Sequence, residues 1–404
     1  RRSRHPRFLY VSWAQIPLRL VGSEMCIRDR VMDRIQEIIE AITPHDSVER
    51  YTSLGVECIE GSAKLVSPHE LEVNGSLLST KNIIIATGAS PAIPPIPGLE
   101  DSTYSTSDSI WKLRKLPKQL LVIGGGPIGC ELAQAFRRLG SEVTILTRDP
   151  KVLPKEDRDL AELVLKNFES EGIQMQTEIK VERIEKKNSE QQVYFRKDGV
   201  EQHIKADHIL LATGRKPVTS GLGLEEVGVE LNPDGTVKVD PFLRSSIPNI
   251  YACGDVAGPF QFTHMASHQA WYATVNALFS PFKKFAVDYR VVPWCTFTDP
   301  ELARVGLSEE DALAQNIAYE KTTFDLSGLD RAIAERNNYG MIKVLTKPGK
   351  DQILGAAICG PHAGDLLSEF VLAMKHGIGL NKILGTIHAY PTYADAKKLT
   401  AGVW

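Results

Sequence analysis

The spacing of apolar residues predicts a helix followed by strands in the first part of the chain. Between residues 31 and 42, valine and isoleucine recur every three or four positions, which is typical of an amphipathic helix, and Pro44 ends it. Strand-like runs follow at 56–66 and 69–79, and the second contains an Asn-Gly turn at Asn74. Regular structure is therefore expected to begin near residue 31.

The middle of the chain predicts a strand–helix–strand unit behind a proline-rich linker. A buried strand is expected at 83–88, and the prolines between residues 91 and 97 exclude regular structure there. An apolar strand at 120–125, a helix at 127–139 and a strand at 143–146 then form the start of a βαβ unit.

Two more strand-plus-glycine segments follow, and the chain ends in a region of mixed type. Residues 208–217 close the βαβ unit, and residues 249–258 lead into a helix at 264–279. From about residue 288, strand patterns are followed by a helical one, which indicates an α+β domain.

Composition and charge indicate a soluble multidomain enzyme. At 404 residues the chain exceeds one ordinary core, and its net charge is −3. This charge does not indicate nucleic acid or an acidic membrane surface as a partner. The expected partner is a small molecule. No apolar run reaches the roughly 20 residues needed to span a bilayer. We expect the protein to be cytoplasmic and not bound to a membrane.

The cysteines do not indicate a structural or metal-binding role. Six are scattered along the chain, without a close pair or a Cys/His cluster at metal-ligand spacing. Neither a disulfide scaffold nor a metal site is therefore predicted.

Residues 1–30 do not match the pattern of the rest. They show neither helical nor strand periodicity, and Gln15, Pro17 and Arg19 interrupt the short apolar stretch that could be taken for a signal peptide. We interpret this segment as artefactual and expect the natural domain to start after it.

A glycine turn carries the strongest local signal. Gly124, Gly126 and Gly129 form a GxGxxG pattern directly after an apolar strand and at the start of a helix. The first glycine permits a tight turn, the second lets a pyrophosphate approach the backbone, and the third lets the helix pack on the strand. This context predicts a dinucleotide site, and the alternative is a purely structural turn.

The choice of nicotinamide dinucleotide depends on the end of the second strand. Thr147 occupies the place where an acidic residue would bind the ribose hydroxyls, and Arg148 follows it. NADPH is therefore favoured. NADH remains an alternative because Asp149 is adjacent, and Arg148 could also be an ordinary surface charge.

Four segments together resemble one enzyme family. IIIATGA, GGGPIGCELAQAF, ILLATGRKP and NIYACGDVAG occur in this order and are similar to the pyridine nucleotide-disulfide oxidoreductases, which include dihydrolipoamide dehydrogenase, glutathione reductase and mercuric reductase. FTDPELARVGLSEEDA resembles the start of the dimerisation domain of that family. The resemblance covers residues 31–404. It implies an α/β fold with two Rossmann-like dinucleotide-binding domains, the first incomplete, followed by an α+β dimerisation domain.

The resemblance also implies domain boundaries. The predicted order is the first part of an FAD-binding domain (31–108), an NAD(P)-binding domain (109–235), the second part of the FAD-binding domain (236–285) and a dimerisation domain (286–404).

Flavin-binding residues are implied by the same motifs. Asp255 matches an aspartate that accepts a hydrogen bond from the ribityl chain and is the favoured flavin residue; an aspartate that only caps a loop is the alternative. Glu131 matches a glutamate near the flavin, although a charge in the first helical turn is also favoured by the helix dipole. The remaining cofactor-binding candidates lie in the glycine-containing strand ends: Ala86, Thr87, Gly88, Gly214, Ala252 and Gly254.

The C-terminal motif departs from that of the dithiol enzymes. Tyr390 stands where they have a catalytic histidine, and Asp395 stands where they have its orienting glutamate. His388, two residues earlier, is not expected to be the catalytic group. A phenol with a pKa near 10 does not shuttle protons as readily as imidazole, so dithiol exchange is disfavoured. Mercuric reductases have a tyrosine at the corresponding place, so the pattern is closest to theirs.

The predicted function is hydride transfer from NADPH to FAD and onward to a disulfide-like or metal-ion acceptor, in a homodimer. The family's first GxGxxG and its Cys-x4-Cys redox pair are not found before residue 120. We therefore expect this chain to be part of a longer protein and to have little activity alone. The alternatives are a non-catalytic dinucleotide-binding and dimerising module, and dihydrolipoamide dehydrogenase.

Overall fold

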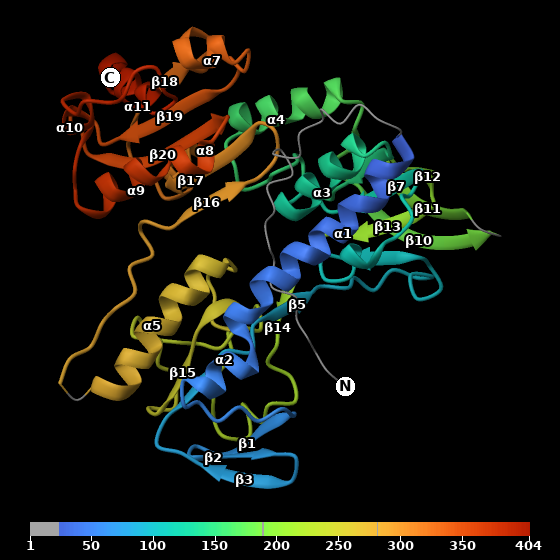
Figure 1. Cartoon of the computed structure of the whole chain (residues 1–404), viewed down its shortest axis with the longest axis vertical. Coiled ribbons are helices and arrows are strands. Elements are labelled where there is room, and N and C mark those ends of the chain that lie inside the picture. The colour runs from blue at the N-terminus through green and yellow to red at the C-terminus, as the bar shows by residue number, and fades with distance from the viewer. Residues whose placement is uncertain (1–23, 188–189, 281) are drawn as a thin grey trace. The chain divides into compact units, whose positions relative to one another are not determined.

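The chain forms two compact units in a computed structural model that describes residues 24–187, 190–280 and 282–404 (Figure 1). One unit contains residues 93–213 and 290–404, and the other contains residues 33–92 and 214–289. The predicted artefactual segment lies outside the described residues, except for its last positions.

The elements follow one another along the chain with helices and strands interspersed. The α-helices are α1 (Glu24–Ile42), α2 (Val48–Ser53), α3 (Pro127–Arg138), α4 (Arg158–Ser170), α5 (Thr263–Phe279), α6 (Glu309–Ala314), α7 (Asp330–Ala334), α8 (Ala363–Leu366), α9 (Ser368–Lys375), α10 (Leu380–Leu384) and α11 (Asp395–Val403). The strands up to the second glycine-containing segment are β1 (Ala63–Ser67), β2 (Glu70–Val73), β3 (Ser76–Ser79), β4 (Ile83–Ile85), β5 (Ala89–Pro91), β6 (Tyr104–Thr106), β7 (Gln119–Ile123), β8 (Glu142–Leu146), β9 (Gln174–Gln176), β10 (Lys180–Lys187), β11 (Glu190–Lys197), β12 (Val200–Ala206) and β13 (His208–Leu211). The later strands are β14 (Arg215–Pro217), β15 (Ile250–Ala252), β16 (Pro293–Thr296), β17 (Glu301–Gly306), β18 (Glu320–Asp325), β19 (Met341–Thr346) and β20 (Ile353–Gly360).

A parallel sheet forms the centre of residues 93–213. Its strand order is β6-β13-β7-β8-β9, and all of its pairings are parallel. The middle strands β7 and β13 are apolar along almost their whole length, as expected for a parallel sheet that is covered on both faces. The helix α3 connects β7 to β8 and so completes the predicted βαβ unit.

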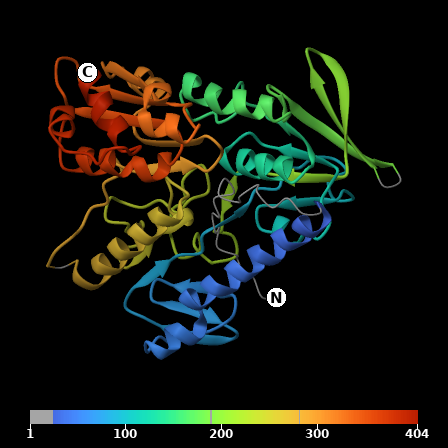
Figure 2. The same cartoon turned by 45° about the horizontal axis from the view of Figure 1, so that its top comes forward.

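An antiparallel sheet of three strands, β10-β11-β12, belongs to the same unit. Figure 2 shows its first hairpin, in yellow-green, extending away from the helices of the unit. Its apolar side chains, among them Val193 and Phe195, pack with residues of the parallel sheet in one core.

The C-terminal domain, residues 290–404, is built on an antiparallel sheet with the order β16-β17-β20-β19-β18. Its core combines apolar residues of the central strands with Leu366, Leu367 and Phe370, which lie on or between α8 and α9. This arrangement of helices with an antiparallel sheet confirms the predicted α+β domain.

The second unit contains three small sheets. Strands β1, β2 and β3 form a meander, β14 pairs with β5, and β15 pairs with β4 in parallel. The turn between β2 and β3 is the predicted one, since Asn74 and Gly75 both have positive φ (53° and 78°), as a type I′ hairpin requires.

Some element boundaries differ from those expected. Residues 56–62 form no strand, because the alternation there is interrupted by charged residues and Gly61. The helix α1 begins at Glu24 instead of residue 31, in a segment whose glutamate, methionine and arginines have good helix propensity.

Domain limits also shift relative to the prediction. Strand β6 lies at an edge of the parallel sheet although residues 93–108 were assigned to the FAD-binding domain, and residues 214–235 lie in the other unit. A strand as short as β6 has too few residues to show a period. Among the described residues, no helix combines the length and the apolar character that crossing a bilayer needs.

Candidate functional site

The glycine turn lies between β7 and α3, as its sequence predicted. A Cβ on Gly129 would lie 2.1 Å from the carbonyl oxygen of Gly124, so only glycine lets the helix start this close to the strand end. Gly124 has φ of 122°, and a Cβ there would meet the carbonyl oxygen of Ala212 at 2.2 Å. These two glycines are required by the fold itself.

Gly126 is different, because a Cβ added to it would meet no atom within 4 Å. Its backbone is extended (φ −78°, ψ 179°), a conformation open to other residues. Folding alone therefore does not explain this glycine. Open space over Gly126, next to the first N–H groups of α3, fits a pyrophosphate that approaches the backbone.

The end of β8 presents one exposed and one buried side chain. Arg148 is exposed, whereas Thr147 is 3% exposed and its hydroxyl accepts a hydrogen bond from the Asp149 N–H at 3.2 Å. The Asp149 carboxylate lies 3.3 Å from the Thr147 hydroxyl and so is turned back toward its own turn. Of the two neighbouring charges, Arg148 is the one presented to solvent.

Glu131 is buried in α3. Its carboxylate accepts a hydrogen bond from the backbone N–H of Phe297, which follows β16, at 2.8 Å. Burial raises the pKa of Glu131 to about 8, and the Phe297 N–H offsets part of this increase. The glutamate therefore links the βαβ unit to the C-terminal domain, and this is a more specific role than a charge in a helical turn.

In the second unit, the strand ends that carry the remaining glycine motifs lie together. Ala252 pairs with Ile85 across the parallel strands β15 and β4, which brings the residues after both strands to the same edge. The Thr87 hydroxyl donates to the carbonyl oxygen of Val218 at 2.6 Å. Gly88 (φ 70°) and Gly214 (φ 108°) both have open space where a Cβ would be.

Asp255 is paired with an arginine that the sequence did not single out. The Arg215 Nε lies 3.3 Å from the Asp255 Oδ2, and both side chains are mostly buried. Burial raises the pKa of Asp255, and the Arg215 guanidinium opposes that increase. A buried carboxylate beside a guanidinium offers acceptors and donors to a polyhydroxylated, phosphorylated cofactor.

Gln269 of α5 holds the backbone turn around Asp255. Its side chain is fully buried, accepts a hydrogen bond from the Gly254 N–H (2.7 Å) and donates to the Gly258 carbonyl oxygen (2.8 Å). Gly254 has φ of 77°, which favours glycine at this position. The helix α5 thereby fixes the backbone position of Asp255.

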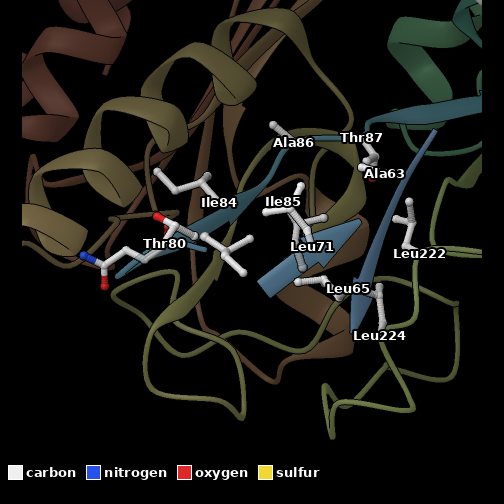
Figure 3. Close-up of a pocket in the computed structure, with 12 residues that line it drawn as sticks. Ala63, Leu65, Leu71, Thr80, Ile84, Ile85, Ala86, Thr87, Leu222 and Leu224 are labelled. Carbon is white, nitrogen blue, oxygen red and sulfur yellow. The ribbon is translucent and has the colours of Figure 1, made fainter. Parts of the chain in front are cut away.

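An apolar cavity of about 340 Å³ lies beside β4 in the second unit (Figure 3). Figure 3 shows leucines of the meander and of the 222–224 segment facing it together with Ile84 and Ile85. In the described residues β4 has a single neighbouring strand, β15. The other edge of β4 is therefore open. This is unusual, because parallel strands normally occur in larger sheets that are covered on both faces.

Tyr390 is 72% exposed in the C-terminal domain, and its hydroxyl donates to the Asp330 Oδ2 at 2.7 Å. This hydrogen bond and the Asp330 charge raise the pKa of Tyr390. Asp395 begins α11 and its charge acts in the same direction, but the carboxylate that accepts the hydroxyl is that of Asp330. The sequence did not indicate Asp330, because it lies 60 positions away.

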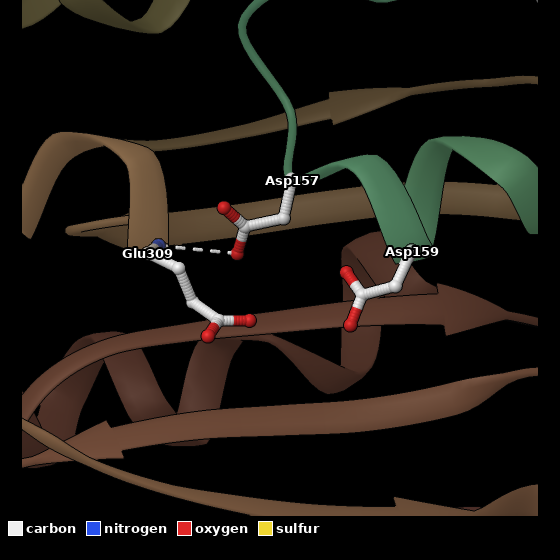
Figure 4. A group of neighbouring side chains, drawn as sticks. All are labelled: Asp157, Asp159 and Glu309. Carbon is white, nitrogen blue, oxygen red and sulfur yellow. Dashed lines mark hydrogen bonds between the residues drawn. The ribbon is translucent and has the colours of Figure 1, made fainter. Parts of the chain in front are cut away.

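Three carboxylates where the βαβ unit meets the C-terminal domain converge as metal ligands would (Figure 4): those of Asp157, Asp159 and Glu309. The ammonium group of Lys343 already lies among them, 3.2, 2.5 and 2.6 Å from their oxygens respectively. Lys343 is 1% exposed. The cluster is therefore an internal ion-pair network in which a lysine supplies the positive charge.

The parallel sheet, the glycine turn and the open space at Gly126 define a dinucleotide-binding α/β protein. The chain belongs to the pyridine nucleotide-disulphide oxidoreductase family: the family model matches residues 21–270, and the model of the family's dimerisation domain matches residues 292–401. This result confirms the predicted family and fold class.

Related proteins agree with this assignment. The chain is 36% identical to a mercuric reductase from Bacillus cereus over 355 residues, 87% of this chain and 56% of the relative. It is 38% identical to a dihydrolipoyl dehydrogenase from Thermus scotoductus over 346 residues, 84% of this chain and 73% of the relative. A solved structure of the HOCl-induced flavoprotein disulfide reductase RclA from Escherichia coli superimposes with a TM-score of 0.83 at 28% identity, covering 93% of this chain and 86% of that one. The chain thus spans little more than half of the Bacillus cereus enzyme.

Proposed function

We propose that this chain is part of an enzyme that transfers a hydride from NADPH to FAD and passes the electrons to a disulfide-like or metal-ion acceptor. The observation that carries the proposal is the open space over Gly126 at the start of α3, since neither strain nor packing requires glycine there. The family match and the names of the relatives support a flavin and a pyridine nucleotide.

Each unit contributes residues that suit one cofactor. In the first, the α3 N-terminus and Arg148 would hold the pyrophosphate and the 2′-phosphate of NADPH. In the second, Asp255 and Arg215 would hold the polar chain of FAD, and Gly88 and Gly214 would allow its close approach. Bound FAD would supply the two-electron chemistry that protein side chains lack.

Glu131 and Tyr390 are the proposed catalytic residues outside the glycine turns. A carboxyl group with a pKa of about 8 is mostly protonated at neutral pH, so Glu131 is suited to donate or exchange a proton. The exposed Tyr390 hydroxyl, held by Asp330, is suited to contact an acceptor or a second copy of the chain. Asp395 is proposed as an auxiliary charge near it.

The acceptor class and the oligomeric state are part of the same proposal. Mercuric reductases are among the relatives, and Tyr390 replaces the histidine of the dithiol enzymes, which favours a metal ion over a dithiol. The match to the dimerisation domain supports a homodimer. Light scattering that returned only monomers would contradict the dimer.

A visible absorption spectrum of the purified chain, before and after anaerobic addition of NADPH, tests the proposal. A flavin band that bleaches supports hydride transfer. A folded chain that binds NADPH without any flavin would favour the second candidate, a non-catalytic dinucleotide-binding module. The open edge of β4 and the cavity beside it favour this candidate. They indicate that the second unit would need additional strands beside β4 before it could hold a flavin.

Substitution of Asp255 is expected to remove most of the flavin. In D255N the buried Arg215 loses its carboxylate partner and the cofactor loses a charged acceptor, so we expect at least a tenfold lower flavin-to-protein ratio, or about 1.4 kcal/mol. The ratio is measured from the absorption spectrum after dialysis. The matched control is E230Q, which changes an exposed ion pair with Lys238 in the same unit. Equal flavin content in D255N and the wild type would contradict the assignment.

Arg148 is expected to distinguish the two nicotinamide cofactors. In R148A we expect NADPH to bind about tenfold more weakly, with NADH affinity unchanged, since only NADPH carries the 2′-phosphate. Isothermal titration of both cofactors measures this difference, and R158A, at a highly exposed arginine of α4, is the control. If both affinities fall equally, Arg148 does not select the cofactor.

A further inference from the structure

The connection between α10 and α11, residues 385–394, has no regular secondary structure, yet the side chains of His388 and Tyr393 are buried. Ile387 is 93% exposed and Tyr390 is 72% exposed, whereas the side chain of His388 between them is 6% exposed. Surface connections of this kind are usually mobile unless side chains fix them. His388 thus anchors the part of this connection that precedes Tyr390.

Both ring nitrogens of His388 face hydrogen-bond acceptors. Nδ1 lies 3.1 Å from the carbonyl oxygen of Thr386, and Nε2 lies 3.1 and 3.2 Å from the two carboxylate oxygens of Glu369 on α9. Glu369 also binds the Nζ of Lys397 on α11, at 2.7 Å, and Lys397 is 6% exposed. We call His388, Glu369 and Lys397 the His388 clamp; it joins the connection to two helices.

The clamp acts on the segment that carries Tyr390. The Tyr390 hydroxyl reaches Asp330 at the start of α7, and the hydroxyl of Tyr393, farther along, donates to Glu335 just after α7. The connection is therefore held on α7 by two tyrosines and on α9 and α11 by one histidine. A rotation of the backbone at His388 would move Tyr390 away from Asp330.

We propose that His388 is a positioning residue for Tyr390, and that the His388 clamp holds the tyrosine hydroxyl at the place where it meets the electron acceptor. This inference rests on the proposed function only for the role of Tyr390. The pairing of His388 with Glu369, 19 positions earlier, gives the histidine a place in the site that the motif alone did not suggest.

The substitution H388Q tests the clamp with little risk to the fold. Glu369 keeps Lys397 as its partner in this variant, so no buried charge is left alone. H376Q, at an exposed histidine that follows α9, is the matched control.

The first measurement is NMR of the full chain with tyrosine labelled at the ring carbon that bears the hydroxyl. Y390F identifies the signal of Tyr390, and D330N shows its position when the carboxylate acceptor is lost. We expect H388Q to shift the Tyr390 signal toward the D330N position, and H376Q to leave it unchanged. A Tyr390 signal in H388Q that coincides with the wild type, while D330N shifts it, overturns the proposal.

The second measurement is the NADPH-dependent reduction of mercuric ion by the full chain, as a double-mutant cycle. We expect H388Q to lower kcat by about tenfold in the wild type and by less than twofold in Y390F, because its effect passes through Tyr390. An equal loss of kcat on adding H388Q to the wild type and to Y390F would contradict the proposal that His388 positions Tyr390. The cycle applies where the wild-type chain reduces mercuric ion; since no Cys-x4-Cys pair occurs before residue 120, a chain without this activity leaves the NMR measurement to test the His388 clamp by itself.

Discussion

The substitution G126A is expected to change the stability of the protein only slightly and to weaken NADPH binding at least tenfold. Alanine is compatible with the extended backbone of Gly126 and its Cβ meets no atom within 4 Å, but it is a poorer N-cap than glycine, so we expect the free energy of unfolding to fall by less than about 1 kcal/mol. The same Cβ would occupy the space into which a pyrophosphate has to come. A tenfold loss of affinity corresponds to about 1.4 kcal/mol.

The matched control for this prediction is G129A. Its Cβ would lie 2.1 Å from the Gly124 carbonyl oxygen, so α3 has to move and we expect a loss of stability of about 1–3 kcal/mol. Urea unfolding and NADPH titration of both variants separate a glycine required by the ligand from one required by the fold. Wild-type NADPH affinity in G126A would remove the main support for the dinucleotide site.

The second large effect is expected for K343M. This substitution removes the buried ammonium group and leaves Asp157, Asp159 and Glu309 with their charges close together. Removing one partner of a buried ion-pair network typically costs about 3–5 kcal/mol. We expect a loss of this size in the free energy of unfolding, measured by urea denaturation.

A surface lysine of the same domain provides the control for K343M. Lys321 also pairs with Glu309, but its side chain is 44% exposed, so K321M is expected to cost less than about 1 kcal/mol. Adding D157N to K343M should restore part of the stability, because it removes one of the repelling charges. A loss below 1 kcal/mol in K343M itself would mean that solvent screens the cluster.

Local sequence chemistry was sufficient for the elements that depend on neighbouring residues. The GxGxxG turn, the βαβ unit around it and the Asn74–Gly75 hairpin turn are where the sequence predicted them. In these cases a few adjacent residues determine the backbone conformation, since glycine supplies φ values or close contacts that other residues do not. Strands as short as β6 were missed because they contain too few residues to show a period.

What the sequence by itself determined is the family, the fold class and the positions of the glycine turns, because these depend on motifs a few residues long. Only the tertiary structure decided which polar and charged side chains meet: Tyr390 and Asp330, His388 and Glu369, Lys343 and Asp157. These partners are 60, 19 and 186 positions apart. Their pairing results from the packing of helices and connections on sheets, which brings distant side chains together and buries a charge such as that of Lys343 only where opposite charges are within reach.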